Sequence, residues 1–315
     1  MTLPLVTTII PSFNHGKYIG QAIESVLAQD YPHIQFIIVD DGSSDDSHSV
    51  IQSYVEKHPQ ITAILNTDNR GQSAVFNQAL SLAQGEFVQL LPSDDWYAPE
   101  KTRLQLEKFL ASPPEVGVVY GRGQRFFEDT GEIKLAPAPI HRGKVAEIFI
   151  THGQFIYPIT PMFRRSIFDK VQLDETLKAE GEAVYIRMAI HCEFDFVDEV
   201  VGTMRDHTYN IGKQTDIMYE EVQRYWTAFF QRDDIPDNLR ALRKISMRRL
   251  HRTKGLQFIG ENRNYRMGRI ALLRAIRADP MLLIDPKVIG ALAITMLPGS
   301  LADWVVAKRP EKRHA

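Results

Sequence analysis

The chain has 315 residues, of which 44% are hydrophobic and 24% are charged, and this balance is that of a globular protein with a sizeable core. Its formal net charge of −2 excludes a global basic field for nucleic-acid binding. Cys192 is the single cysteine, which excludes an internal disulfide. The N-terminus lacks the basic and apolar segments of a signal peptide, and no apolar run is long enough to span a membrane. We therefore expect a cytoplasmic protein.

Short apolar runs alternate with amphipathic stretches over the first third of the chain. Runs rich in β-branched residues predict four strands, and apolar residues at helical spacing predict three helices between them. The strands are expected at residues 5–10, 35–39, 61–65 and 86–91, and the helices at 18–29, 47–57 and 72–83. Such alternation predicts an α/β fold with a mainly parallel sheet covered by helices on both faces.

The pattern is more varied after the fourth predicted strand. A helix is expected at residues 99–110 and another at 182–191, and strands are expected at 116–120, 124–127 and 194–204. From about residue 216 onward the chain changes to long helical stretches rich in Arg and Lys. We therefore predict a first domain over residues 1–215 and a helical C-terminal segment over residues 216–315.

A polar loop follows each of the four N-terminal strands. These loops are residues 12–15, 40–45, 67–71 and 93–95. Because ligands of such sheets bind outside the carboxyl ends of the strands, the four loops together indicate one binding site.

Each loop taken alone also has a purely structural interpretation. The Asp, Gly and Ser of residues 40–45 favour a solvated turn, although a carboxylate at a strand end can also accept hydrogen bonds from a nucleobase or a ribose. Residues 69–71 are typical of a helix-capping turn, but an Arg beside a helix N-terminus can also serve a diphosphate.

The adjacent carboxylates of Asp94 and Asp95 are the most informative pair. Ser93 or either aspartate can cap the helix that follows, since Pro99 is typical of a first helical turn. Two neighbouring carboxylates repel each other, however, and a divalent cation relieves that repulsion. Ligands that are oxygen alone suit Mg²⁺ or Mn²⁺, which then completes its shell with substrate phosphates.

Other signatures of nucleotide or metal chemistry are missing from the sequence. There is no Walker A motif, no complete dinucleotide fingerprint and no His-Glu-x-x-His pair. One cysteine cannot build a structural zinc site.

Four stretches in this order resemble family 2 glycosyltransferases. They are TTIIPSFNHGKYIGQAIESVLAQDYPHIQFIIVDDGSSDDS, NRGQSAVFNQAL, GEFVQLLPSDDWYAPEK and VGTMRDHTYN, and the resemblance covers roughly residues 3–212. It implies the nucleotide-diphospho-sugar transferase (GT-A) fold and an inverting sugar transfer. The expected partners are a nucleotide-sugar donor, with UDP as the favoured nucleotide, and a saccharide or lipid-linked acceptor in glycan biosynthesis.

The resemblance also implies roles for individual residues. Asp41 would hydrogen-bond the base, Asp94 would touch the ribose or donor sugar, and Asp95 would bind a divalent metal, Mn²⁺ or Mg²⁺. His207 matches a late basic position near the phosphates or the metal. The remaining residues expected in the donor pocket are Pro11, Ser12, Asn14, Asp40, Arg70, Gly71 and Arg205.

An inverting transfer also needs a base for the acceptor hydroxyl. The family pattern Glu-Asp-x-x-Leu-x-Leu-Arg corresponds here to AEGEAVYIRMA, so Glu180 matches the Glu and Gly181 stands where the Asp is expected. Glu180 is the first candidate for the base, and Glu182 is the second. Gly181 also motivates an alternative, namely a transferase-like protein that binds a nucleotide sugar without turnover.

The C-terminal segment leaves two interpretations open. Its many arginines and the apolar stretch MLLIDPKVIGALAITMLPGSLADWVV are compatible with a peripheral helix at the inner face of a membrane. The other interpretation is a helical subdomain that packs on the catalytic domain or forms a homo-oligomer, which the interruptions at Asp285-Pro286 and Pro298-Gly299 favour.

Overall fold

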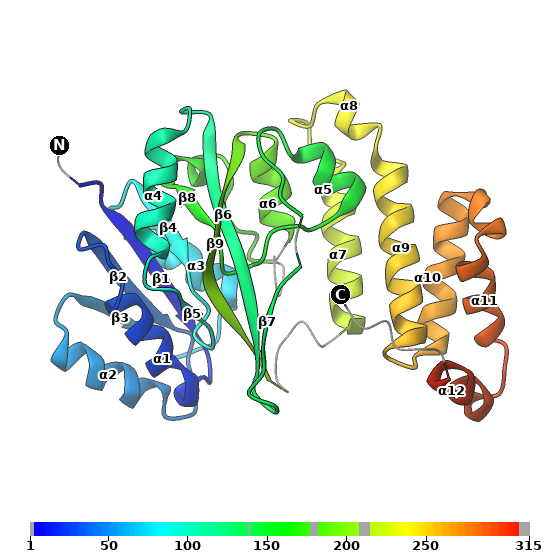
Figure 1. Cartoon of the computed structure of the whole chain (residues 1–315), viewed down its shortest axis with the longest axis horizontal. Helices are drawn as coiled ribbons and strands as arrows, with labels where there is room; N and C mark the ends of the chain where they lie inside the picture. Colours follow the sequence, from blue (N-terminus) through cyan, green and yellow to red (C-terminus); the bar gives the residue numbers. More distant parts are fainter. Residues whose placement is uncertain (1–2, 138, 177–181, 208–214, 309–315) are drawn as a thin grey trace. The chain divides into compact units, whose positions relative to one another are not determined.

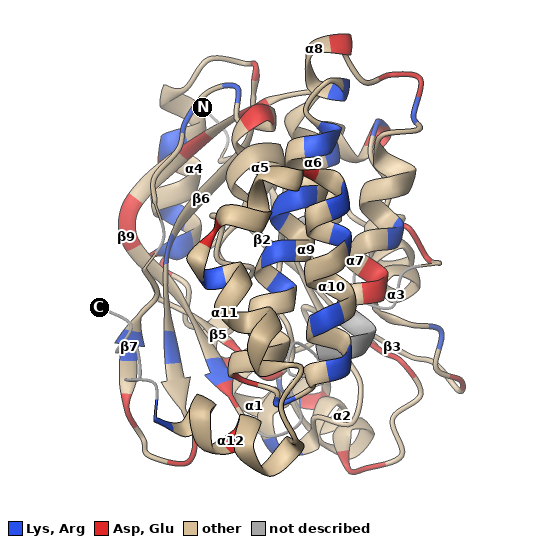
Figure 2. Ribbon diagram, turned by 90° about the vertical axis from the view of Figure 1, so that its right-hand side faces the viewer, with Lys and Arg blue, Asp and Glu red and all other residues tan. Residues whose placement is uncertain are grey.

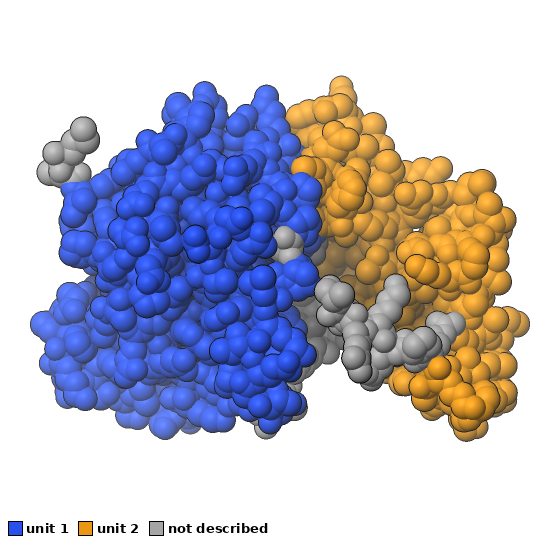
Figure 3. Space-filling view, in the orientation of Figure 1, with its two compact units in different colours: residues 1–146, 154–210 blue, residues 147–153, 211–315 orange. Residues whose placement is uncertain are grey.

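The computed structural model describes residues 3–137, 139–176, 182–207 and 215–308. The chain forms two compact units, which Figure 3 shows in different colours. The first contains residues 1–146 and 154–210, and the second contains residues 147–153 and 211–315.

The first unit begins with the predicted alternation of strands and helices (Figure 1). The strands are β1 Val6–Ser12, β2 Ile34–Asp40, β3 Ile61–Leu65 and β4 Phe87–Leu90. The helices between them are α1 Gly16–Leu27, α2 Ser47–Lys57 and α3 Gln72–Leu80. These four strands pair in parallel in the order β3-β2-β1-β4, which confirms the α/β prediction.

Strand β1 extends further than the sequence predicts, because Pro11 does not end it. The backbone N–H and C=O groups of Ile9 are directed toward β4, and the Ile9 carbonyl accepts the N–H of Leu91. The backbone nitrogen of Pro11, two residues later, is directed to the same side. The pairing of β1 with β4 stops at Ile9. Proline is therefore tolerated at position 11, because no residue of β4 would accept a hydrogen bond from a backbone N–H there. On the other side β1 continues along β2 to Ser12, which brings the two polar loops together.

The rest of the first unit completes a nine-stranded sheet in the order β3-β2-β1-β4-β8-β6-β9-β5, with β7 beside β6. The added strands are β5 Trp96–Tyr97, β6 Val116–Phe127, β7 Ile133–Leu135, β8 Met162–Arg164 and β9 Glu193–Asp206. The helices are α4 Lys101–Ala111, the 3₁₀ helix η1 Arg165–Asp169 and α6 Glu182–Ala189.

Two predictions for this region are wrong. The helix expected at residues 99–110 begins only at Lys101 as α4, and Ser93, Asp94 and Asp95 do not cap it, because Trp96 and Tyr97 between them form β5, antiparallel to Gly202 and Thr203 of β9. Residues 116–127 form one continuous strand and not two. Gly121 and Gly123 interrupt the apolar pattern for a packing reason, since a Cβ at Gly123 would lie 2.0 Å from the ring of Tyr157.

The second unit is helical, as predicted for the C-terminal segment. Its elements are α5 Ala146–His152, α7 Thr215–Phe229, α8 Asp237–Arg240, α9 Arg243–Gly260, α10 Tyr265–Ala278, the 3₁₀ helix η3 Pro280–Ile284, α11 Pro286–Ile294 and α12 Gly299–Ala307. Asp279 and Asp285 cap η3 and α11, each followed by a proline in the first turn. Among the described residues, we find no helix with the length and apolar character needed to cross a membrane.

Candidate functional site

The polar loops after β1, β2 and β3 meet at the carboxyl edge of the sheet. The carbonyl of Asp40 accepts the N–H of Asn66, and the carbonyl of Ser12 accepts the N–H of Asp41, at 2.9 and 2.8 Å. Gly42 has a φ of 74°, and a Cβ there would lie 2.8 Å from the backbone of Asp68. A glycine is therefore required where these loops touch.

Asp41 fixes the loop that leads into α3. Its two carboxylate oxygens accept the backbone N–H groups of Arg70 and Gly71 at 2.7 and 2.8 Å, and the residue is only 4% exposed. Gly71, at φ 91°, is the N-cap of α3. Each oxygen of Asp41 keeps a second lone pair for a ligand, since an ionised carboxylate has about four acceptor positions. The guanidinium of Arg70 lies on an exposed residue at the edge of the site.

Asp40 performs a similar task in the preceding turn. It is fully buried, and its carboxylate accepts the N–H and the hydroxyl of Ser43 at 2.8 and 2.7 Å. The Nε2 atom of His48 lies 2.8 Å from Oδ1 of the same carboxylate. Asp40 therefore stabilises the turn that contains Ser43. Asp41 stabilises the loop that leads into α3.

The loop after β1 contains two predicted site residues with different surroundings. Asn14 has a positive φ of 53°, donates its N–H to the Ser43 hydroxyl and accepts the N–H of Ser44 with its side-chain oxygen. Ser12 is 3% exposed, and its hydroxyl lacks a hydrogen-bond partner within the part of the chain that the structure describes. A buried hydroxyl of this kind at a strand end is suited to receive a ligand atom. Pro11 is buried beside it in β1.

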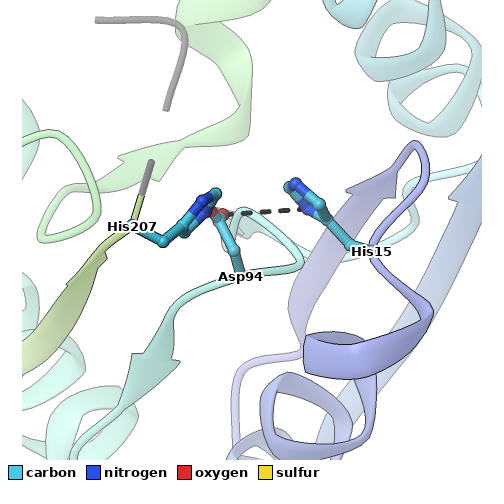
Figure 4. A group of neighbouring side chains, drawn as sticks. All are labelled: His15, Asp94 and His207. Atoms are coloured by element: carbon cyan, nitrogen blue, oxygen red, sulfur yellow. Dashed lines mark hydrogen bonds and ion pairs between the residues drawn. The ribbon is translucent and has the colours of Figure 1, made fainter. Parts of the chain in front are cut away.

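Asp94 lies between two histidines, as Figure 4 shows. The Nε2 atom of His207 is 3.0 Å from Oδ2 of Asp94, and the Nδ1 atom of His15 is 4.0 Å from Oδ1. The three residues offer ligand atoms that all lie within 4.8 Å of one another. His15 also makes a 2.8 Å hydrogen bond between Nδ1 and the hydroxyl of Ser93.

This group fits a divalent transition-metal ion. Two imidazole nitrogens and one carboxylate oxygen suit Mn²⁺, Fe²⁺ or Zn²⁺ better than Mg²⁺, which prefers oxygen ligands. Burial lowers the pKa of His15 below 6.5 and outweighs the opposite effect of Asp94, so the neutral imidazole that a metal requires is favoured. The carboxylate pair alone predicts oxygen ligands only, which differs from this arrangement, whereas His207, which the resemblance places near the metal, is one of the three residues.

Asp95, the metal ligand expected from the family resemblance, lies outside this group. It is 3% exposed, and its Oδ1 atom accepts the backbone N–H of Arg205 at 2.8 Å. Burial, together with the charge of Asp94, raises the pKa of Asp95 well above 3.8. Asp95 therefore connects the loop before β5 to the end of β9 through a hydrogen bond. Within the described residues, Asp94 is the aspartate that lies with the two histidines.

Arg205 and Tyr18 surround this group with aromatic and cationic contacts. The guanidinium of Arg205 lies 4.8 Å from the ring centre of Tyr18 and 5.1 Å from that of Trp96. Its Nε atom donates to the backbone carbonyl of Asp94 at 3.2 Å. The ring of Tyr18 stacks on that of His207, with centroids 5.0 Å apart. These contacts fix the orientation of both His207 and the backbone at Asp94.

The sequence interpretation places His15 in the polar loop of residues 12–15 but assigns it no role of its own. Tyr18 is expected only as the first residue of a helix, and its contact with His207 has no signal in the sequence. The predicted base, Glu180, lies outside the described residues. Glu182 is the first residue of α6, but its side chain is not described. Both remain predictions.

Comparisons with known proteins identify the family of the chain. The family model "Glycosyl transferase family 2" matches residues 7–172. An uncharacterized glycosyltransferase of Nostoc sp. is 38% identical over 191 residues, which cover 57% of this chain and 58% of that protein. The chain thus spans about half the length of the curated relatives it matches.

Solved structures show the same fold. Staphylococcus aureus TarS 1–349 in complex with UDP has a TM-score of 0.64 at 19% identity, covering 92% of this chain and 87% of that one. Mannosyltransferase PcManGT from Pyrobaculum calidifontis in complex with GDP-Man and Mn²⁺ has a TM-score of 0.62 at 16% identity, covering 97% and 86%. The GT-A fold expected from the resemblance is confirmed, and the chain belongs to glycosyltransferase family 2.

Proposed function

We propose that this protein transfers a sugar, with inversion, from a nucleotide-diphosphate donor to the hydroxyl of a saccharide or lipid-linked acceptor. The observation that carries the proposal is the group of His15, Asp94 and His207 beside loops whose backbone is fixed by Asp40 and Asp41. Membership of glycosyltransferase family 2 supports the reaction class.

The donor nucleotide would bind along the loops after β1, β2 and β3. Asp41 would use its remaining lone pairs for the base, and the buried hydroxyl of Ser12 would hydrogen-bond the base or ribose. Arg70 would lie along the diphosphate with its exposed guanidinium. UDP is the donor nucleotide we favour; TarS has been solved with UDP and PcManGT with GDP-Man, and both nucleotides belong in the test.

The diphosphate would face the group of His15, Asp94 and His207. A divalent metal held there would supply Lewis-acid neutralisation of the departing diphosphate. Asp95 and Arg205 would act as positioning residues, because the first holds the backbone of the second and the second donates to the carbonyl of Asp94. Arg205 also keeps a positive charge close to the site.

The chain itself would supply the base for the acceptor. The carboxylate of Glu180, or of Glu182, would take the proton of the acceptor hydroxyl. The oxygen of that hydroxyl would attack the anomeric carbon of the donor sugar from the face opposite the diphosphate. The bond to the diphosphate breaks in the same step, so the configuration at that carbon inverts. Positioned bases of this kind contribute roughly 10²–10⁴-fold to the rate.

Transfer and hydrolysis assays test this proposal. UDP-, GDP- and dTDP-sugars should be incubated with Mn²⁺ and with Mg²⁺, and release of the nucleoside diphosphate should be followed. Turnover of one donor that is lost in Asp94→Asn supports the proposal. Gly181 motivates the alternative of a protein that binds a nucleotide sugar without turnover; donor-dependent thermal stabilisation with no release from any donor would establish it.

A further inference from the structure

Exposed apolar side chains gather on the last three helical elements of the second unit. Met281 and Ile284 lie on η3, Ile289 and Met296 lie along and just after α11, and Leu301 and Trp304 lie on α12. Met296 is 80% exposed and Trp304 is 55% exposed. We refer to these six residues as the apolar patch.

The apolar patch is the outer side of helices whose inner side is also apolar and is packed in the core of this unit. Its members recur at helical spacing, three residues apart on η3 and α12 and seven apart from Ile289 to Met296. The opposite sides of the same helices bury Val288, Ala291, Ile294, Ala302 and Val306 in the core of this unit. Asp285-Pro286 and Pro298-Gly299, which interrupt the apolar stretch in the sequence, stand at the starts of α11 and α12.

The helices around the apolar patch are strongly basic. Residues 240–308 contain fourteen Lys and Arg against four Asp and Glu, although the whole chain has a net charge of −2. Figure 2 shows the Lys and Arg of α9 and α10 in blue, whereas α11 and α12 are mostly tan. Two of the four acids are already neutralised, since Asp279 pairs with Arg248 at 2.7 Å and Asp285 with Arg252 at 2.6 Å.

Four exposed cations on or next to α10, α11 and α12 lie outside these ion pairs. Arg266 and Arg277 lie on α10, Lys287 lies at the start of α11, and Lys308 follows α12. Within the described part of the chain, none of these four forms an ion pair with a carboxylate. The ammonium of Lys308 lies 4.0 Å from the ring centre of Trp304, so an aromatic ring and a cation project from the same turn of α12.

We infer that the second unit docks, through the apolar patch and these four cations, on the surface of a lipid bilayer that contains anionic headgroups. Exposed Trp and aliphatic side chains next to Lys and Arg are the composition of helices that lie in a membrane interface. The apolar patch would enter the boundary between headgroups and acyl chains, and the four cations would contact the anionic headgroups. This inference does not depend on the proposed sugar transfer.

Two other occupants fit the same face less well. A second copy bound by two-fold symmetry would place this basic surface against itself, so that like charges would oppose one another. A nucleic acid would satisfy the cations, but it would leave the aliphatic side chains of the apolar patch in water.

Vesicle binding by the full-length protein tests the inference. Flotation should be compared between vesicles of phosphatidylcholine alone and vesicles with about one third phosphatidylglycerol. We expect binding to the second kind only, weaker at high salt, with a blue shift of the Trp304 emission that is missing in Trp304→Phe.

Two variants with matched controls separate the apolar and the charged contributions. Leu301→Ser with Trp304→Ser removes the apolar contribution without changing the charge, and Leu110→Ser is its control, since Leu110 is 65% exposed in the first unit. Arg266→Ala, Arg277→Ala and Lys287→Ala together remove three charges, and Lys57→Ala, Arg165→Ala and Lys170→Ala remove three exposed charges from the first unit. Each patch variant should lower partitioning roughly tenfold or more, and each control should leave it within about twofold.

Three results would overturn the inference. The first is no binding to anionic vesicles by a folded protein. The second is charge-dependent binding that Leu301→Ser with Trp304→Ser leaves unchanged, which would indicate a general polyanion site. The third is a dimer in solution that this double variant dissociates, which would identify a second copy as the occupant.

Discussion

His207 and Asp94 are 113 residues apart in sequence, yet Nε2 of the histidine lies 3.0 Å from Oδ2 of the aspartate. The strand β9 makes this contact possible, because its pairing with β5 places its last residues beside the loop that carries Asp94. The two neighbouring aspartates of this loop consequently have different tasks, which variants can separate.

The first prediction concerns metal binding by those two aspartates. Asp94→Asn should abolish tight binding of Mn²⁺, since it removes the charged oxygen that lies between two histidines. Asp95→Asn should retain binding, because an amide oxygen can still accept the N–H of Arg205. Electron paramagnetic resonance of free Mn²⁺ during titration measures both affinities. Equal loss in the two variants would contradict this division of roles.

The second prediction concerns the selectivity that His15 confers. His15→Ala should weaken Mn²⁺ binding by roughly 10–100-fold or more, while binding of Mg²⁺ should change much less. The reason is that imidazole nitrogen is a good ligand for transition metals and a poor one for Mg²⁺. Calorimetric titrations with each ion give the ratio. His33→Ala is the control, since His33 precedes β2 and its Nδ1 contacts the carbonyl of Leu3 before β1, at the opposite end of these strands from His15.

The third prediction concerns the loop held by Asp41. Asp41→Asn replaces one accepting oxygen with an NH₂ group, so the N–H of Arg70 or of Gly71 loses its partner. The free energy of unfolding should fall by about 1–3 kcal/mol, and donor binding should weaken. Asp68→Asn in the same loop is exposed and should be nearly neutral. Urea unfolding and thermal shifts with nucleotide sugars measure the two effects.

The fourth prediction concerns the stability of the second unit in acid. Burial, followed by the charge of Arg274, lowers the pKa of His251 from 6.5 to about 4. Between these pH values the unfolded chain binds a proton that the folded unit excludes, so stability falls as pH drops through this window. The loss should be on the order of 3 kcal/mol.

Trp226, which is buried in the same unit, reports this transition in a Trp96→Phe, Trp304→Phe background. His251→Gln removes the titrating group but keeps an acceptor for the hydroxyl of Tyr219, whose oxygen lies 2.8 Å from Nδ1 of His251. The midpoint of urea unfolding should therefore depend less on pH in this variant. An unchanged dependence would assign the acid sensitivity to another group.

Much of the first unit follows from the sequence, because buried parallel strands leave a clear apolar signal. The strand Ile61–Leu65 and the helix Ser47–Lys57 have the predicted bounds. The meeting of the polar loops also follows, since the topology of a parallel sheet brings the carboxyl ends of its strands to one edge.

The orientation of single side chains could not be predicted in the same way. The sequence pattern does not distinguish Asp94 from Asp95. In the fold, β9 places the backbone N–H of Arg205 where the carboxylate of Asp95 accepts it, so Asp95 is the buried one of the two. The histidine at position 15 has no periodic signal and meets its partners only in the folded sheet. Likewise, Trp96 and Tyr97 form a strand because β9 offers an edge there, which local propensity does not reveal.

The hydrogen bonds from backbone N–H groups to Asp41 bear on which residues of this loop can change in evolution. Because Asp41 holds the N–H groups of Arg70 and Gly71 and not their side chains, these two hydrogen bonds can form with any residue except proline at position 70. Gly71, at φ 91°, has no such freedom, since other residues are strained there. Proteins related to this chain can therefore differ in the side chain at position 70 without rebuilding this loop.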